Sequence, residues 1–205
     1  RYKCFEEFTA IRETHNISVW GGNALKFLSS NPDSRLGLEV GLEIKALARG
    51  GRMDICLLSD NILFVAESKI SLVDMLNENR FISQLIAYEG EIQNVRDCFD
   101  KSFQHHKFLL IGGSEFDLLP VNDAHRSLLH GGYTETFYDL LYHHDFFFIS
   151  ANALLALGLK KLLIGDQYSL ENVSMQLFSP GNYGLVSSGL VRYDGADFIV
   201  EPFRV

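Results

Sequence analysis

The segment 36–47, LGLEVGLEIKAL, alternates between aliphatic residues and residues that are polar or glycine. This period of two is typical of a strand with one buried face. Two apolar runs follow at 53–58 and 62–69, and a short polar break at 59–61 separates them. A glycine-rich turn at 49–51 precedes the first run. The pattern predicts three consecutive strands joined by tight turns.

Beyond residue 72 the hydrophobic period changes to three and four, which predicts a long amphipathic helix over 72–99. Shorter helices are expected at 4–13 and at 21–31, the second of which follows two glycines. A further helix is expected at 151–164, between a capping serine and a terminating glycine.

Two further buried strands are expected at 107–113 and 145–150, and the tail, 178–205, predicts more β structure. This order of elements predicts an α/β fold in which helices flank a mixed central β-sheet. The 205 residues suffice for one domain with a sizeable core. We expect a single domain over 1–205, with its core at about 20–165 and the tail as a β-rich extension.

Three charged residues stand within the two apolar runs: Asp54 in the first, and Glu67 and Lys69 at the end of the second. If the runs pair across a tight turn, position 54 comes near position 67, and 67 and 69 share a face because they are two residues apart. The three charges would then meet at the edge of a sheet. Two buried carboxylates are costly unless cations offset them, and oxygen ligands of this kind suit Mg²⁺. The pattern therefore indicates a site for metal-assisted attack on a phosphodiester.

Asp54, followed after twelve residues by Glu67-Ser68-Lys69 in a hairpin with a long helix behind it, resembles the PD-(D/E)XK nuclease superfamily. The resemblance covers the expected core and is greatest to the cleavage domains of type II, type IIS-like, restriction endonucleases. It implies a restriction-endonuclease-like fold, with Mg²⁺ (or Mn²⁺ in its place) held by Asp54, Glu67 and the backbone carbonyl of Ser68. It also implies that Lys69 positions or deprotonates the attacking water, and that Gln84 on the following helix takes part in catalysis.

Two features depart from that superfamily. Met53 stands where the name of the motif has proline. Many members carry an additional glutamate on a helix before the first strand, but the segment 21–31 has none. Glu39 or Glu43 from the first strand could compensate, and the sequence alone does not decide between them.

Structural explanations compete with the catalytic one. Asp54 could end a strand and bind the neighbouring glycine turn, while Glu67 and Lys69 could form a solvated strand end. Gln84 could be a boundary residue of its helix. The histidine pairs at 105–106 and 143–144 lack the spacing of zinc ligands. The basic residues outside the motif are expected on the surface: Arg126, Lys160 and Lys161.

The net charge of −8 is unusual for a protein that grips nucleic acid unaided, because phosphate contacts supply most non-specific affinity. We therefore expect a DNA endonuclease of restriction or defence type whose affinity comes from a DNA-binding domain or subunit, or from assembly as a homodimer or heterodimer. The alternative is a non-catalytic binding or scaffold module that retains the nuclease fold. A nuclease of the same fold that acts on RNA or branched DNA is a further alternative.

No apolar run approaches the ~20 residues that cross a bilayer, and the first residues, RYKCFEEF, lack the apolar segment of a signal peptide. The three cysteines lack metal-ligand spacing and are expected as reduced thiols, with Cys56 in the core. We expect a cytoplasmic protein without a membrane partner. Because the sequence does not begin with Met, we expect a processed form or a part of a longer protein.

Overall fold

The computed structural model describes residues 17–42, 51–69, 87–88, 90, 92, 103–113, 146–177, 182–186, 189–193 and 198–202. The helix expected at 4–13 lies outside these residues. So does the helix expected at 72–99, apart from residues 87, 88, 90 and 92.

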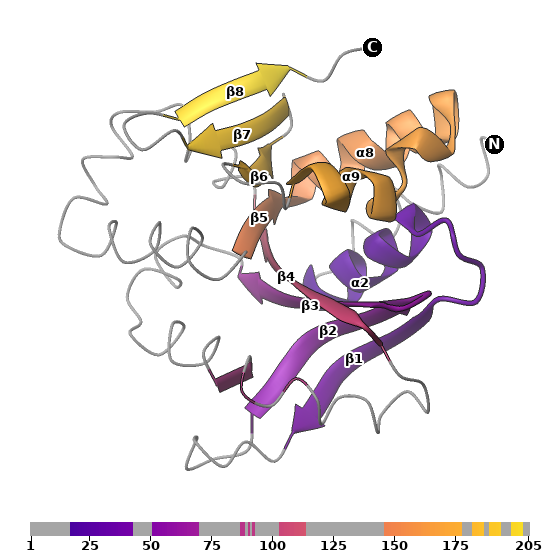
Figure 1. Ribbon diagram of the computed structural model, residues 1–205, viewed down its shortest axis with the longest axis vertical. Helices are drawn as coiled ribbons and strands as arrows, with labels where there is room; N and C mark the ends of the chain where they lie inside the picture. Colours follow the sequence, from indigo (N-terminus) through magenta and orange to yellow (C-terminus); the bar gives the residue numbers. More distant parts are fainter. Residues whose placement is uncertain are drawn as a thin grey trace, which may run out of the picture.

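The described strands form one mixed sheet whose spatial order follows the sequence (Figure 1). The first three strands are antiparallel, the third to the sixth pair in parallel, and the last three are antiparallel again. The α/β architecture with a mixed sheet is therefore confirmed, and strands of the tail continue the same sheet. The strands are β1 (Arg35–Leu42), β2 (Gly51–Ser59), β3 (Ile62–Lys69), β4 (His105–Gly112), β5 (Phe146–Ser150), β6 (Asn182–Val186), β7 (Gly189–Tyr193) and β8 (Phe198–Pro202).

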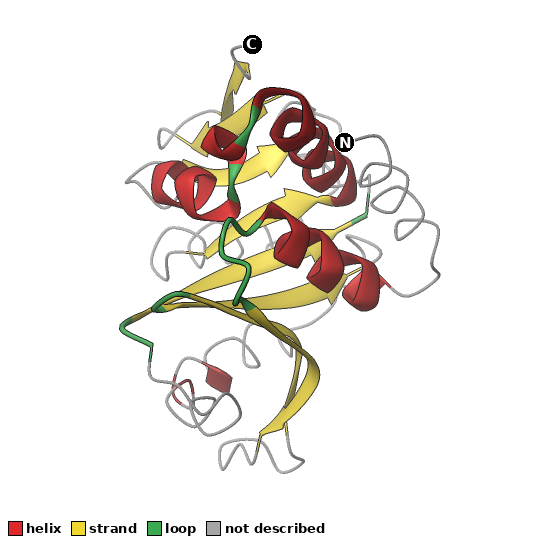
Figure 2. Ribbon diagram, turned by 90° about the vertical axis from the view of Figure 1, so that its right-hand side faces the viewer, coloured by secondary structure: helices red, strands yellow, loops and turns green. Residues whose placement is uncertain are grey.

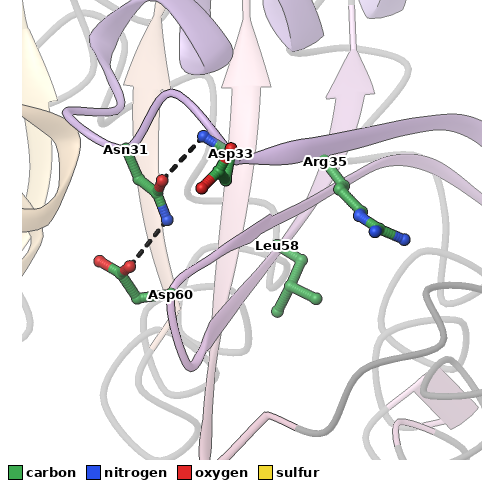
Figure 3. A pocket seen from close by; sticks show the side chains of 5 residues that line it. All are labelled: Asn31, Asp33, Arg35, Leu58 and Asp60. Atoms are coloured by element: carbon green, nitrogen blue, oxygen red, sulfur yellow. Dashed lines mark hydrogen bonds between the residues drawn. The ribbon is translucent and has the colours of Figure 1, made fainter.

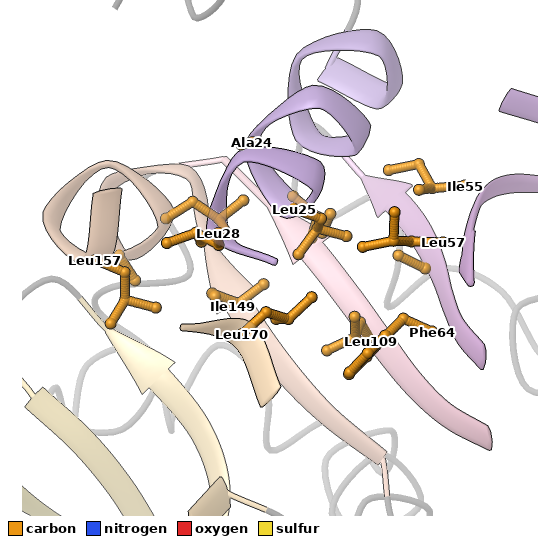
Figure 4. Close-up of a cluster of buried hydrophobic side chains, with 14 of the residues drawn as sticks. Ala24, Leu25, Leu28, Ile55, Leu57, Phe64, Leu109, Ile149, Leu157 and Leu170 are labelled. Atoms are coloured by element: carbon orange, nitrogen blue, oxygen red, sulfur yellow. The ribbon is translucent and has the colours of Figure 1, made fainter. Parts of the chain in front are cut away.

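The described helices of more than one turn lie on one side of this sheet (Figures 1 and 2). They are α2 (Ile17–Leu28), α8 (Ala151–Ile164) and α9 (Leu170–Leu177), with a short 3₁₀ helix η3 (Asp166–Tyr168) between the last two. Their apolar side chains and those of the sheet form one buried cluster (Figure 4). Its members include Leu25, Leu28, Leu57, Phe64, Leu109 and Leu157.

Helix α2 begins at Ile17, so the expected start at residue 21 was wrong. Gly21 and Gly22 lie inside the helix, where they lower its intrinsic helix propensity. In the sequence they therefore look like the boundary of a helix. Their role is close packing on the sheet. A Cβ on Gly22 would lie 2.7 Å from Leu38 Cδ2, and one on Gly21 would lie 3.0 Å from Ile111 Cδ1.

The local signals at α8 are confirmed. The hydroxyl of Ser150 accepts a hydrogen bond from Ala153 N at 3.0 Å, which caps the start of the helix. Gly165 ends the helix with a φ of 115°, in the region that favours glycine, and its N–H donates to Lys161 O.

Lys161 ties α8 to the carboxyl end of α2. Its ammonium donates to three consecutive carbonyls, Phe27 O, Leu28 O and Ser29 O, at 3.1, 2.8 and 2.9 Å. The side chain is only 13% exposed, so the expectation of a surface position was wrong. An ammonium group has three donors, and the last carbonyls of a helix lack partners within it. Lys161 therefore acts as a C-terminal cap supplied by another helix.

Glu171 on α9 joins the same region through three donors. Its carboxylate accepts from Ser59 Oγ at 2.6 Å, from Ser29 Oγ at 2.9 Å and from Ser30 N at 3.1 Å. Burial by itself raises the pKa of this carboxyl. The hydrogen bonds outweigh burial and leave the pKa below its ordinary value of 4.5. Glu171 thus links α9 to the ends of α2 and β2 in its ionised form.

We predict that the stabilising effect of Glu171 depends on pH. A carboxyl whose pKa is lower in the folded state contributes stability above its unfolded pKa, and loses it as the pH falls through the folded pKa. Urea unfolding should show Glu171→Gln to be less stable than the wild type by about 1–2 kcal/mol at pH 7. The difference should shrink as the pH falls below 4.5. Glu201→Gln, at an exposed position of β8, serves as the control. A difference that is constant or grows on acidification would contradict the prediction.

Candidate active site at the carboxyl end of strand β3

Strands β2 and β3 bring Asp54 and Glu67 together, as the sequence predicted. Their antiparallel register runs from Ser59 opposite Ile62 to Ile55 opposite Ala66. The next step of the same register places Asp54 beside Glu67. The tight turn between the strands is also confirmed, with Asp60 at a φ of 51°.

The side chain of Asp54 binds the backbone of β3 between the other two charged residues. Asp54 Oδ2 accepts a hydrogen bond from Ser68 N at 2.8 Å. A backbone N–H thus holds the half-buried carboxylate at a fixed place beside β3. The competing structural explanation is a bond from Asp54 to the glycine turn at 50–51. Residue 50 of this turn lies outside the described residues.

Glu67 and Lys69 form an ion pair at this place. Lys69 Nζ lies 3.1 Å from Glu67 Oε1, and the two side chains are 21% and 5% exposed, in that order. Glu67 is therefore buried, which contradicts the explanation of a solvated strand end for this residue. An uncompensated carboxylate in such a position would be costly, and Lys69 offsets part of that cost.

The three charged residues lie on the face of the sheet away from α2. Ile55 and Ala66 belong to the core cluster that packs against α2, and neighbouring residues of a strand alternate between faces. Asp54 and Glu67 are therefore on the opposite face, and Lys69 shares it.

The site is not at a lateral edge of the sheet, as the sequence analysis expected. β3 is an internal strand with parallel β4 on its other side, where Glu67 lies opposite Leu110 and Lys69 opposite Gly112. The charged residues are at the carboxyl end of β3. The apolar partners on β4 explain why Glu67 is buried although it lies near the end of its strand.

Tyr88 binds the backbone of β2 close to Asp54. Its side chain is 1% exposed, and its hydroxyl donates a hydrogen bond to the carbonyl of Arg52, two residues before Asp54. The sequence placed Tyr88 on an amphipathic helix but gave no signal for this bond. Gln84 lies outside the described residues, so its proposed role stays a prediction.

The donor set is compatible with a hard divalent cation. Carboxylate and carbonyl oxygens are the ligands that Mg²⁺ prefers, and Mg²⁺ keeps several waters when only one or two carboxylates bind it. A carboxylate can accept about four contacts, so the bonds to Ser68 N and Lys69 Nζ do not preclude coordination by Asp54 and Glu67. Among the side chains that the structure describes, no group of three or more His, Cys, Asp or Glu could hold a metal ion.

A polar pocket of about 270 Å³ lies elsewhere, at the turn end of β2 (Figure 3). Asn31, Asp33, Arg35, Leu58 and Asp60 line it. Asn31 Nδ2 donates to Asp60 Oδ1 at 2.7 Å, and Asn31 Oδ1 accepts from Asp33 N at 2.8 Å. The first bond ties the β2–β3 turn to the loop before β1, and the second lies within that loop. We therefore regard the pocket as part of the scaffold and not of the site.

Cys56 is buried in the core, as expected, and its Sγ donates a weak hydrogen bond to Met53 Sδ at 3.7 Å. His105 and His106 begin β4, at the end of the strand away from the charged residues, and the ring of His106 contacts Phe108 edge-on at 5.2 Å between centroids. In the described part of the chain, no helix is long and apolar enough to cross a membrane.

Comparisons with known proteins give one structural likeness. The small subunit of the heterodimeric restriction endonuclease R.BspD6I, known from a crystal structure, superposes with a TM-score of 0.46 and 13% sequence identity, over 87% of this chain and 89% of that subunit. No protein-family model matches the sequence. No curated protein matches it either.

Proposed function

We propose that this protein is a Mg²⁺-dependent endonuclease that hydrolyses phosphodiester bonds of DNA, of restriction or defence type. The observation that supports it most is the joint position of Asp54, Glu67 and Lys69: Asp54 binds Ser68 N, and Lys69 binds Glu67. A buried carboxylate with a second one beside it and an ammonium two residues away is what a metal-assisted hydrolase needs. A sheet that merely needed a stable strand end would not require it.

Each residue then has a separate role. Asp54, Glu67 and the carbonyl of Ser68 would hold Mg²⁺, or Mn²⁺ in its place. The bound ion would stabilise charge on the phosphoryl oxygens and lower the pKa of a water molecule. Lys69 would orient the attacking water and hold a proton close to it, and Glu67 fixes the ammonium for this task at 3.1 Å. From the superfamily resemblance we expect in-line attack that leaves a 5′-phosphate and a 3′-hydroxyl.

The affinity for DNA is expected to come largely from elsewhere. A net charge of −8 repels phosphate, and salt at physiological strength screens this repulsion only beyond about 8 Å. We predict that the isolated chain binds random duplex weakly and cuts poorly, and that a fused DNA-binding domain, a partner subunit or dimerisation raises its activity. A gel-shift titration checks this. Sub-micromolar binding by a monomer that resists salt would contradict it.

A non-catalytic binding or scaffold module is the second candidate. The described side chains favour it in one respect, since they provide two neighbouring carboxylates and no group of three metal-ligating residues. Calorimetric titration with Mg²⁺ and Mn²⁺ separates the two functions. The proposed nuclease should bind at millimolar metal or below, and an absence of heat at that concentration would exclude it. A panel of duplex DNA, branched DNA and RNA would then identify the substrate.

A further inference from the structure

Arg52 places a positive charge on β2, two residues before Asp54, and its side chain is exposed. Strand β2 keeps a single register with β1 throughout, in which Arg52 lies opposite Gly41. Residues two apart in a regular strand share a face, with Cα atoms about 6.5 Å apart. Arg52 therefore lies beside Asp54 on the face of the sheet that carries Glu67 and Lys69.

The surroundings of Arg52 fix its backbone and leave its guanidinium accessible. The hydroxyl of Tyr88, a side chain that is 1% exposed, donates a hydrogen bond to the carbonyl of Arg52. Gly41, the residue opposite on β1, has no side chain that could cover the guanidinium. The planar guanidinium has five donors in a fixed arrangement that matches two oxygens of a phosphate. An exposed arginine on an anchored backbone is thus well suited to bind an anion.

The other lysine and arginine side chains that the structure describes as exposed lie farther from the site. Lys26 is on α2, on the opposite side of the sheet. Arg35 lies opposite Leu58, six residues from Arg52 along β2, which corresponds to about 20 Å. Because a net charge of −8 makes positive charge scarce, Arg52 is the exposed cation of the described residues best placed to attract a phosphate toward Asp54.

We propose that Arg52 binds a backbone phosphate of duplex DNA beside the phosphate that is cut. The inference rests on the proposed function, in which Asp54 and Glu67 hold the ion and Lys69 acts on the attacking water. The two carboxylates repel DNA, and a guanidinium two residues along the same strand offsets that repulsion locally. A bidentate contact between guanidinium and phosphate is among the stronger hydrogen-bonded interactions. Arg52 thus contributes affinity and the position of the substrate, whereas the site residues carry out the cleavage.

Fluorescence anisotropy of a labelled random duplex, titrated with the full chain in EDTA over a series of salt concentrations, tests the proposal without cutting the DNA. Arg52→Gln should weaken binding roughly tenfold at low salt, the effect of losing one charge-assisted contact. The slope of log K against log salt should become shallower by about 0.9, the contribution of one phosphate. Arg52→Lys keeps the charge and should keep the slope. Arg35→Gln, about 20 Å away, should match the wild type in both quantities.

Mn²⁺ calorimetry on the same variants separates this role from a structural one. Arg52→Gln should bind Mn²⁺ like the wild type because the ligands of the ion are unchanged, and a fall in that affinity would overturn the proposal. So would wild-type affinity and slope for DNA in Arg52→Gln, a loss of slope in Arg52→Lys, or a wild type that binds no duplex at low salt. The proposed nuclease fails separately, if the wild type takes up no Mn²⁺ or Mg²⁺. The DNA titration then still decides whether Arg52 binds phosphate.

Discussion

Lys69→Met is expected to abolish phosphodiester cleavage while metal binding persists, whereas Asp54→Asn is expected to abolish both. In the proposed mechanism Lys69 acts on the water and is no metal ligand, so its removal takes away a cation beside Glu67 and leaves the ligand oxygens in place. Asp54, in the same mechanism, would contribute a charged oxygen to the ion. Because a metal ion supplies several kcal/mol of charge stabilisation, the loss in rate should be at least about a hundredfold.

Calorimetric titration with Mn²⁺ and a cleavage assay on the same preparations measure the two effects. Lys26→Met, on the exposed side of α2, and Asp33→Asn, on the loop before β1, are matched controls that should behave as the wild type. Wild-type cleavage by either site variant would remove the catalytic assignment. Loss of metal binding in Lys69→Met would show that the lysine maintains the site and does not act on the water.

Lys161→Met should destabilise the protein by about 2–4 kcal/mol, which for a chain of this size corresponds to a fall in Tm of roughly 5–12 °C. The ammonium satisfies three carbonyls at the end of α2, and methionine keeps the apolar stem but none of the donors. Burial lowers the pKa of Lys161, and the charges of Asp166 and Glu171 counter this effect. The contacts of the ammonium with the three carbonyls therefore compensate for the cost of removing its charge from water.

Lys160→Met is the matched control for this prediction. Lys160 is the preceding residue of α8, and its ammonium lies 5.1 Å from the centroid of the Tyr168 ring. The Nζ atom of Lys160 is buried, and a cation–π contact of a desolvated ammonium is worth about 2 kcal/mol. Removal of the charge also removes its desolvation cost, so the net loss in Lys160→Met should stay below about 1 kcal/mol. Thermal unfolding should therefore separate the two variants clearly. Equal losses in both would show that the carbonyl contacts of Lys161 contribute little.

The features that the sequence predicted correctly carry local signals. The apolar runs on each side of residues 59–61 define β2, the turn and β3, and this register alone suffices to bring Asp54 beside Glu67. The two ends of α8 can likewise be predicted from the sequence, because Ser150 and Gly165 have conformational preferences that operate within one turn of the helix.

The features that the sequence did not reveal depend on partners distant along the chain. Glycine occupies positions 21 and 22 inside the helix because α2 packs closely against Leu38 and Ile111 there. Lys161 is a cap because its partners are more than 130 residues away on α2. Position 39 lies opposite Asp54 because of the register between β1 and β2, and the local pattern of the two strands does not specify that register.

The same reasoning explains why the tail could be recognised as β structure but not placed. Its strands alternate in the expected way, yet β6 joins the sheet by parallel pairing with β5, with Phe148 opposite Gly184. Parallel neighbours need a crossover connection, and here the chain passes through α8, η3 and α9 between β5 and β6. Nothing in the local pattern of 178–205 specifies which strand it will meet.

Fusion of the chain to a sequence-specific DNA-binding domain gives the most direct measurement of the proposed activity, because the fused domain supplies the affinity that a net charge of −8 withholds. The assay follows strand breaks in a plasmid that carries the recognition site of that domain. The wild-type fusion should break the DNA near the site in Mg²⁺ and not in EDTA, and the Asp54→Asn fusion should bind but not cut. A wild-type fusion that binds both DNA and Mg²⁺ yet leaves the plasmid intact would contradict the nuclease assignment, and so would equal cutting by both fusions.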